Sequence, residues 1–340
     1  MKAIAYQTNL PIDHPDSLVD ITLPDPVATG HDLLVEVHAV SVNPVDYKIR
    51  SGVKPADGEW KVIGWDAAGI VKAVGPDVTL FRPGDRVWYA GSLVRAGSNS
   101  ELQLVDERIV GKMPQSLDFT AAAALPLTTL TAWELLFDRL EIPQDEGDNS
   151  AKGKTLLVIG AAGGVGSILV QLARQLTGLT VVGTASRPET RDWAIKNGAH
   201  HVIDHSKPLA AEYAQTGLAA PEYVISLTHT DHHFDQIVEV IAPQGKFGLI
   251  DDPAEFDVRK LKRKAASLHW ELMFTRSLYG TADMVKQHEI LNRVADLVDA
   301  GTIRTTVNEN FGRIDAANLK RAHALLESNR AQGKIVLAGF

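Results

Sequence analysis

Hydrophobic and polar residues alternate through much of the first 110 residues of the chain. The run Leu33–Val40 is typical of these segments, as expected of strands that are buried on one face. Between residues 62 and 88 the chain is interrupted by Gly64, Gly69, Gly75 and the turn Pro83–Asp85. Turns at such close spacing predict a compact, partly closed β-sheet.

The pattern changes near residue 118. Residues 118–137 have helical character, and Pro126 predicts a kink or a boundary between two helices. After a polar linker at 141–153, strand-like runs alternate with helical ones. The expected strands are Thr155–Ile159, Thr180–Thr184, His201–Ile203, Tyr223–Leu227, Lys246–Ile250 and Ser267–Phe274, with helices at 165–176, 188–197, 207–217 and 232–242. This alternation predicts an α/β fold with a doubly wound parallel sheet, followed by a helix at 283–299 and short strands ending at Gly333–Leu337.

Length and composition limit the classes of function. The 340 residues suggest about two domains, and 45% hydrophobic residues suffice for a sizeable core. The net charge of −8 argues against a nucleic-acid partner. With no cysteine, disulfides and thiolate chemistry are excluded. We see no signal-peptide run and no stretch of membrane-spanning length, so we expect a cytoplasmic protein without a membrane partner. The basic run Arg259–Lys264 is interpreted as a solvated turn, with an anion patch as the alternative.

The most specific local motif is a glycine-rich turn between a strand and a helix. Gly160 permits a tight turn, Gly163 lets the backbone approach a pyrophosphate, and Gly166 lets the helix pack closely on the strand. The first N–H groups of the helix then face the anion. The alternative is a turn that binds nothing, but the flanking strand and helix favour a dinucleotide site formed by Gly160, Gly163, Gly164, Val165 and Gly166.

The end of the second strand indicates which dinucleotide is bound. An NAD site usually has Asp or Glu here, on the ribose 2′-hydroxyl. This chain has Ser186, Arg187 and, one helical turn later, Arg191, which suit a 2′-phosphate. The sequence therefore predicts NADPH; alternatively, the arginines only charge the start of the next helix. His205 is expected beside the adenine, or else in a solvated turn.

The order of motifs resembles the medium-chain dehydrogenase/reductase superfamily. The residues that carry the resemblance are Ser41–Lys48, Gly64–Gly69, Gly84–Val87, Leu125–Glu134, the glycine turn and Gly333–Leu337. Within the quinone oxidoreductase branch, three longer stretches resemble the subgroup called zinc-type alcohol dehydrogenase-like proteins: Ser226–Phe234, Ala242–Pro253 and Ser267–Ser277. The match spans essentially the whole chain.

The resemblance implies a fold, an assembly and further site residues. A GroES-like β-barrel of residues 1–125 and 275–340 would carry the substrate site, with a Rossmann domain of residues 126–274 inserted and the active cleft in the crevice. Two copies would pair through Ser267–Phe274, which otherwise leaves an open sheet edge. Cofactor contacts are also expected at Thr129, Leu227, Thr228, Ile250 and Lys334.

Zinc ligands of the zinc-dependent relatives are missing from this chain. The family's Cys and His positions correspond to Asn43 and Trp65, which are not preferred zinc ligands, and residues 121–131 offer no Cys, His or acid. We therefore expect a protein that works without metal. A second cluster could form another metal site: His229, Asp231, His232 and His233. Alternatively, these residues shape the mouth of the cofactor site or begin a helix that Asp231 caps.

Without zinc, alcohol oxidation is disfavoured because nothing stabilises the alkoxide. Reduction of a quinone or enone needs a bound cofactor that gives a hydride, alignment of that cofactor with the substrate, and a hydrogen-bond donor to the developing oxyanion. Candidate catalytic groups are Asn43, Tyr47, Lys48 and Asp66. Asp46 is expected to order the loop. Tyr47 could equally serve only in packing, and for Asp66 a role in supporting the fold is favoured over a catalytic one. The sequence thus predicts an NADPH-dependent quinone or enone reductase acting on a small molecule. The alternatives are a zinc-type alcohol dehydrogenase and a non-catalytic, crystallin-like NADPH-binding protein.

Overall fold

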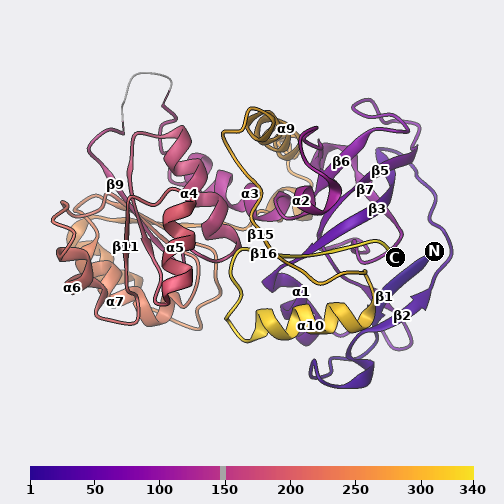
Figure 1. Ribbon diagram of the computed structural model, residues 1–340, viewed down its shortest axis with the longest axis horizontal. Coiled ribbons are helices and arrows are strands. Elements are labelled where there is room, and N and C mark those ends of the chain that lie inside the picture. The colour runs from indigo at the N-terminus through magenta and orange to yellow at the C-terminus, as the bar shows by residue number, and fades with distance from the viewer. Residues whose placement is uncertain (146–150) are drawn as a thin grey trace. The chain divides into compact units, whose positions relative to one another are not determined.

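A computed structural model describes residues 1–145 and 151–340, and the contacts within the chain divide it into two units (Figure 1). Unit 1 contains Met1–Leu130 and Phe274–Phe340, and unit 2 contains Thr131–Met273. Unit 2 therefore interrupts unit 1 in the sequence.

Six parallel strands form the sheet of unit 2. Their spatial order is β11 (His201–Ile203), β10 (Thr180–Thr184), β9 (Thr155–Ile159), β12 (Tyr223–Ser226), β13 (Lys246–Leu249) and β14 (Ser267–Trp270). The order runs outward in both directions from β9 and β12, so the predicted doubly wound Rossmann sheet is confirmed. Because all strands are parallel, the loops that follow them emerge at one edge of the sheet, where such folds bind their ligands.

Helices cover both faces of this sheet (Figure 1). Helices α4 (Gly164–Leu176) and α5 (Pro188–Lys196) contact each other and strands β9 to β11. Helices α6 (Leu209–Ala214) and α7 (Thr230–Val240) pack together, and Phe234 and Ile237 join Leu157 and Ile159 in one buried cluster. Strand β9 is buried along its length, as expected of a strand covered on both faces.

The last strand of unit 2 is shorter than predicted. The sequence analysis expected a strand over Ser267–Phe274, whereas β14 ends at Trp270. Only one further ladder-like bond follows, from the Glu271 N–H to the Leu249 carbonyl. Phe274 already stands at the start of helix α8 (Thr275–Tyr279), so the chain has turned away from the sheet by then.

Unit 1 is organised around the long strand β3 (Asp32–Val42). One edge of β3 pairs with β5 (Asp66–Val74), and the other is shared by β7 (Leu102–Asp106) and β16 (Lys334–Ala338). Strands β6 (Arg86–Tyr89), β8 (Val110–Lys112) and β15 (Val307–Asn310) extend this sheet, and a second sheet has the order β2 (Val19–Thr22), β1 (Lys2–Tyr6), β4 (Lys61–Val62). Pairing of β16 with β3 explains why the last residues belong with the first.

Three helices of nine or more residues lie in unit 1, and two of them were missed in the sequence. Helix α9 (Lys286–Asp299) was expected, but α1 (Pro44–Gly52) and α10 (Ala316–Glu327), which contact each other, were not. Their start signals are present in the sequence: Asn43 precedes Pro44 and forms a capping box with Asp46, and Asp315 accepts a hydrogen bond from the Asn318 N–H.

The apolar run Phe119–Arg139 forms helix α2 (Phe119–Ala123), helix α3 (Pro126–Trp133) and a π-helical turn (Glu134–Arg139). The predicted break at Pro126 is confirmed. The expectation that no stretch could span a membrane was wrong by length and composition, since this 21-residue run has a mean hydropathy of 1.2. However, 83% of its apolar window is buried inside the protein, which is the behaviour of a core helix.

Candidate cofactor and active site

The glycine turn at the end of β9 is the candidate anion site of unit 2. Gly160 has a φ of 86°, a backbone conformation that favours glycine. A Cβ atom on Gly163 would meet only the Gly160 carbonyl at 3.5 Å, whereas one on Gly166 would lie 2.3 Å from that oxygen. Helix α4 has no side-chain cap, so its first N–H groups face the open side of the turn. The residues therefore fit a pyrophosphate, with Gly166 serving close packing.

Arg187 stands where the 2′-phosphate of NADP would be expected. It follows β10 and exposed Ser186, and it occupies the N-cap position of α5. Its Nε atom lies 3.3 Å from Glu189 Oε1, and its side chain is 38% exposed. A bound phosphate would therefore compete with a well-solvated carboxylate for this guanidinium.

Arg191 contacts the backbone at the ends of two strands. Its guanidinium donates to the Val202 carbonyl at 2.9 Å and to the Ala185 carbonyl at 3.5 Å. These carbonyls lie beside the ends of β11 and β10, so Arg191 ties two strands together. The spacing along α5 does not reveal these two backbone acceptors, and the predicted contact of Arg191 with a phosphate stays a prediction.

The remaining predicted cofactor contacts fall into two groups. Leu227 and Thr228 follow β12, Ile250 follows β13 and Val165 lies in the first turn of α4, all in unit 2. Thr129 belongs to unit 1; it is fully buried, and its hydroxyl has no partner in the described part of the chain. This orphaned hydroxyl fits a ligand that would accept or donate one hydrogen bond there.

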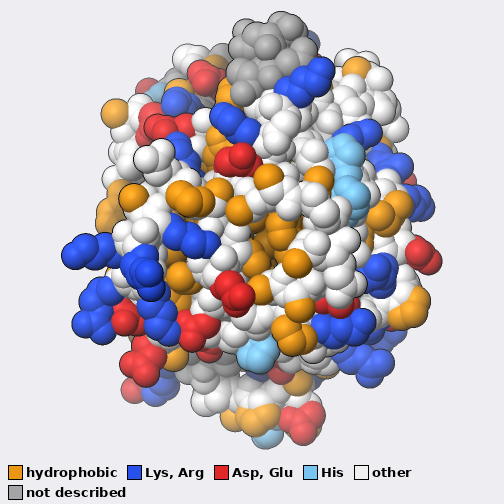
Figure 2. All heavy atoms as spheres, turned by 90° about the vertical axis from the view of Figure 1, so that its left-hand side faces the viewer, with side chains coloured by type: hydrophobic (Ala, Val, Ile, Leu, Met, Phe, Trp, Pro, Cys, Tyr) orange, Lys and Arg blue, Asp and Glu red, His pale blue; other side chains and the backbone are white. Residues whose placement is uncertain are grey.

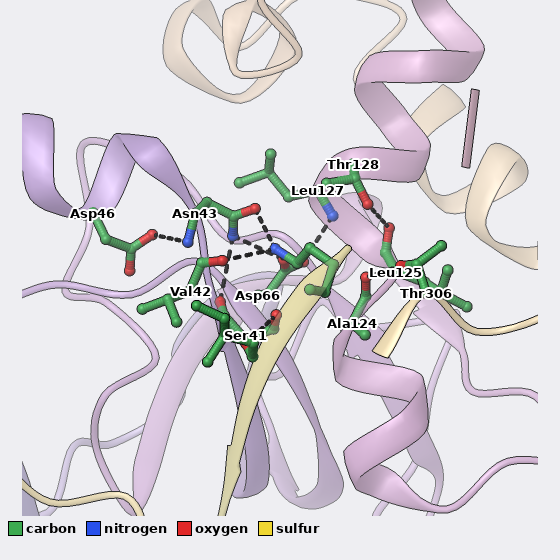
Figure 3. A network of polar contacts seen from close by, with 12 residues as sticks. Ser41, Val42, Asn43, Asp46, Asp66, Ala124, Leu125, Leu127, Thr128 and Thr306 are labelled. Atoms are coloured by element: carbon green, nitrogen blue, oxygen red, sulfur yellow. Dashed lines mark hydrogen bonds and ion pairs between the residues drawn. The ribbon is translucent and has the colours of Figure 1, made fainter. Parts of the chain in front are cut away.

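Lys334 belongs to a polar network in unit 1, and two other members of that network, Asn43 and Asp66, are labelled in Figure 3. Its ammonium donates to the Val42 carbonyl at 2.9 Å, to Asn43 Oδ1, and to Asp66 Oδ2 at 3.0 Å. These contacts use all three N–H donors of a lysine, and the residue is only 2% exposed. The prediction that Lys334 binds the cofactor is therefore corrected: it neutralises a buried carboxylate.

Asn43 and Asp66, predicted as catalytic, belong to the same network. Asn43 Nδ2 donates to Asp66 Oδ2 at 2.8 Å and to the Ser41 carbonyl at 3.3 Å, while Asp66 Oδ1 accepts the Leu127 N–H at 2.7 Å. Both side chains are at most 1% exposed. The network joins β3, β5, β16 and the start of α3, so these two residues support the fold rather than contact a substrate.

Asp46 lies next to this network. Its Oδ2 accepts the Asn43 N–H at 2.9 Å, and its Oδ1 has no partner among the described residues. Burial raises the pKa of Asp46 to about 7, against the lowering effects of the Asn43 N–H and of Lys334. Of these two buried carboxyl groups, only Asp66 accepts a hydrogen bond from the Lys334 ammonium, while Asp46 interacts with it through space. Asp46 orders the loop, as predicted, by capping α1.

Tyr47 and Lys48 stand apart from the network. Half-buried Tyr47 lines a hollow of about 550 Å³, together with the segment Asn9–Asp13, Arg50 and Glu327. Neither Asn43 nor Asp66 lines that hollow. Lys48 is exposed. The four side chains proposed as catalytic are therefore not gathered in one place.

The positions that correspond to zinc ligands do not fit zinc. Asn43 is engaged as described, and Trp65 is 2% exposed with its ring 6.1 Å from that of Phe274. The part of the chain that the structure describes has no group of three His, Asp or Glu side chains placed to hold a metal, so His229, Asp231, His232 and His233 do not form one. Asp231 was also expected to cap α7, but Asp251 accepts the Thr230 N–H at 2.9 Å instead.

The basic run 259–264 lies in a short 3-10 helix, Val258–Lys264. Arg259 pairs with Asp257, Lys260 with Asp235, and Lys264 donates to the Glu239 and Ile241 carbonyls. Figure 2 shows basic side chains next to acidic ones on the face that carries α6 and α7. The run is therefore a solvated, locally paired surface and not an anion patch.

Some residues at the glycine turn were missed in the sequence. Thr184, the last residue of β10, accepts the Gly160 N–H at 3.1 Å, and Asp251 caps α7 from the loop after β13. The only available signal was their position directly after, or at the end of, a predicted strand. Because hydroxyls and carboxylates are common at strand ends, that position alone did not distinguish them.

Comparison with known proteins adds evidence from the whole chain. The family model described as alcohol dehydrogenase GroES-like domain matches residues 29–115, and the one described as zinc-binding dehydrogenase matches residues 197–337. The chain is 37% identical to a zinc-type alcohol dehydrogenase-like protein of Staphylococcus epidermidis, with 99% of both chains covered. It is 32% identical to a quinone oxidoreductase of Pseudomonas aeruginosa, with 90% of both covered. A crystal structure from Rhizobium etli CFN 42, provisionally named a zinc-dependent alcohol dehydrogenase, has a TM-score of 0.95 at 60% identity and covers 100% of this chain and 98% of its own.

Proposed function

We propose that this chain, which belongs to the zinc-type alcohol dehydrogenase-like proteins of the medium-chain dehydrogenase/reductase superfamily, is an NADPH-dependent reductase of quinones, enones or similar conjugated carbonyl compounds that works without metal. The family is one of oxidoreductases. The observation that carries the finer proposal is the state of the positions that correspond to zinc ligands. Asn43 is tied to Asp66 and Lys334, and Trp65 is buried, so neither offers a lone pair to a metal.

The residues of unit 2 suit the hydride donor. Bound NADPH would supply a hydride to a conjugated substrate, which is already activated as an electrophile. The open backbone at Gly163 and the uncapped start of α4 would hold the pyrophosphate, and Arg187 would pair with the 2′-phosphate. No Asp or Glu stands at the end of β10, where it would repel that phosphate.

Unit 1 contains two hydrogen-bonding groups that we propose for the other reactant. The buried hydroxyl of Thr129, which lacks a partner among the described residues, is a donor that a carbonyl oxygen or a carboxamide could use. Exposed Lys48 is a second proposed donor. A conjugated carbonyl needs such a donor when its oxygen becomes negative, but it does not need a base to remove a hydroxyl proton.

The test is NADPH oxidation followed at 340 nm against quinones, enones, aldehydes and ketones, with metal analysis of the same sample purified without an affinity tag. Turnover of quinones or enones that survives a strong chelator supports the proposal. Activity confined to aldehydes and simple ketones, lost with the chelator and restored by zinc, would establish the alternative that the relatives' names suggest. NADPH binding without turnover on any substrate would favour a non-catalytic protein.

We also propose that two copies pair through the edge formed by β14. This strand ends the sheet of unit 2, and Trp270 and Leu272 beside it are 53% and 51% exposed. An unpaired strand edge flanked by exposed apolar side chains is a site of association. Light scattering should give a dimer for the wild type and a monomer for Trp270→Glu; a monomeric wild type at micromolar concentration contradicts the proposal.

A further inference from the structure

The hollow of about 550 Å³ in unit 1 is a second place where a small molecule fits. Three segments form its wall: Asn9–Asp13, which follows β1 closely, one face of α1 with Tyr47, Arg50 and Ser51, and Glu327 at the end of α10. All of them belong to unit 1, whereas the glycine turn belongs to unit 2. The wall therefore shares no residue with the candidate cofactor site, and none with the polar network around the buried ammonium.

Arg50 holds the three segments of the wall together. It is only 2% exposed, its Nη1 donates to the Leu10 carbonyl at 2.5 Å, and its Nη2 donates to Glu327 Oε1. Its own carbonyl accepts from Asn9 Nδ2 at 2.6 Å. The loop and both helices are thus fixed in place by hydrogen bonds within the chain. A ligand would not have to order them, which favours binding to a preformed site.

Polar nitrogens without partners lie behind this wall. Arg50 Nε is enclosed by protein and has no hydrogen-bond partner among the described residues. His323, one turn before Glu327 on α10, is fully buried, and neither of its ring nitrogens has a partner in the described part of the chain. Burial and the nearby Arg50 guanidinium lower the pKa of His323 to about 3, so its ring is neutral. Apolar side chains would fill these places without an unpaired polar atom, so packing alone does not explain this wall.

The groups that the wall leaves available are acceptors. Its donors are largely engaged: both Nη atoms of Arg50 are bonded as described, and Ser51 Oγ donates to the Tyr47 carbonyl at 2.8 Å. Glu327 Oε2 and the carboxylate of exposed Asp13 have no partner among the residues that the structure describes, and the Glu327 side chain is 30% exposed. Because Glu327 already neutralises Arg50, the wall has an excess of negative charge, which favours a cation that donates hydrogen bonds.

The rest of the wall suits an apolar group attached to that cation. Leu10, Pro11 and Ile12 follow one another along the loop, and half-buried Tyr47 faces the same hollow from α1. Aliphatic side chains and an aromatic ring would contact the hydrocarbon part of a ligand. The electron-rich face of a tyrosine ring also attracts an ammonium group.

From this arrangement we infer that the hollow is a second ligand site, for an organic amine in its ammonium form that carries an aromatic or aliphatic body. The ammonium would pair with Glu327 and Asp13, and the body would contact the loop Leu10–Ile12 and the Tyr47 ring. A carboxylate of the same shape would meet two acids and a guanidinium that is already paired. The inference goes beyond the proposed function and does not depend on it. Since the ligand would join the loop, α1 and α10, its binding should stabilise the fold.

The experiment compares probes that share one body and differ in charge. Phenethylamine, 2-phenylethanol, phenylalanine and 3-phenylpropionate are titrated into the full chain at low ionic strength, and binding is followed by saturation-transfer NMR and by the melting temperature. We expect phenethylamine to bind and to raise the melting temperature. The alcohol, the zwitterion and the acid should bind about tenfold more weakly or not at all, as expected when the charge-assisted contacts are lost. Added salt should weaken the binding of the amine.

Variants assign the binding to the hollow. Glu327→Gln should weaken phenethylamine about tenfold, and Asp13→Asn, at an exposed carboxylate, about two- to fivefold. Asp16→Asn removes the same charge from the neighbouring 3-10 helix Pro15–Ser17, outside the wall, and should keep the wild-type affinity. If Glu327→Gln loosens Arg50 and lowers the melting temperature, Asp13→Asn still tests the site, because its side chain is exposed.

Four results would overturn the inference: no binding of the amine, equal binding of the amine and the acid, wild-type affinity in both hollow variants, or an equal loss in Asp16→Asn. None of them touches the proposed function, which is tested by NADPH turnover. Conversely, a chain that does not bind NADPH could still bind the amine, so the two proposals fail separately.

Discussion

Replacing Asp46 with Asn should change how the stability of the protein depends on pH. Asp46 is completely buried, and burial raises its pKa from 3.8 to about 7. A carboxyl group with a raised folded-state pKa favours the protonated form in the fold. Below pH 4 the group therefore does not change the free energy of unfolding. As the pH rises to about 7 it lowers that free energy progressively, and above that it lowers it by a constant amount.

The expected magnitude follows from the displacement of the pKa. A rise from 3.8 to about 7 corresponds to a destabilisation of about 4 kcal/mol at pH above 7. Asn has the shape of the protonated acid, and its Oδ1 can still accept the Asn43 N–H that Asp46 Oδ2 accepts at 2.9 Å. Its NH₂ group would occupy the place of Oδ1, which has no partner among the described residues in the present structure either.

The assay is urea unfolding at a series of pH values between 4.5 and 8.5. Wild type and Asp46→Asn should have similar unfolding free energies at pH 4.5, and the variant should be more stable by a few kcal/mol at pH 8.5. Glu36→Gln, at a half-exposed carboxylate of β3, is a matched control that should show almost no divergence. Parallel curves for wild type and Asp46→Asn across the whole range would refute the argument that this buried acid is protonated in the fold.

Three further predictions address the cofactor site and the core. Arg187→Ala should weaken NADPH binding about ten- to a hundred-fold in calorimetry and leave NADH nearly unchanged; equal losses would mean that Arg187 only supports the fold. Gly166→Ala should lower the melting temperature, because its Cβ would lie 2.3 Å from the Gly160 carbonyl, whereas Gly163→Ala should fold normally and bind NADPH poorly; the reverse order would contradict the assigned roles. Burial and nearby Arg50 lower the pKa of His323 to about 3, so between this value and pH 6.5 the histidine is protonated in the unfolded chain but not in the fold. The free energy of unfolding should therefore fall as the pH drops below 6.5, and His323→Phe should remove that loss in urea unfolding at pH 4.5. An acid sensitivity that is unchanged in the variant would disprove the prediction.

The strands of unit 2 could be predicted from the sequence because their signals are local. Strands β9 and β10 have the predicted bounds, since each is an apolar run closed by a glycine or by a polar turn. Helix α1 was missed because its nine residues follow a long β region and have little apolar periodicity, although Pro44 and Asp46 mark its start. Short helices that depend on caps are easily overlooked when periodicity is the main criterion.

The polar network of unit 1 could not be predicted, because its members are distant in sequence. Asn43 lies 23 residues from Asp66 and 291 residues from Lys334. Each residue alone is compatible with catalysis, and only the fold shows that their donors and acceptors are used on one another. The backbone contacts of Arg191 could not be predicted for the same reason, since its acceptors belong to strand ends that the sequence does not place beside it.

The network also bears on what restoring the family's zinc ligands would do to the stability of this chain. The buried ammonium of Lys334 has three acceptors, and Asn43 Oδ1 is one of them; Asn43 Nδ2 in turn donates to Asp66. A cysteine in place of Asn43 would leave that ammonium one acceptor short and Asp66 without one of its donors. Leaving buried charged groups partly unpaired costs several kcal/mol. Restoring the family's Cys and His at Asn43 and Trp65 would therefore destabilise the network before any metal was bound. In this chain the replacement of the family's zinc ligands and the Asn43–Asp66–Lys334 network are therefore linked, and restoring the ligands would require changes at all three positions.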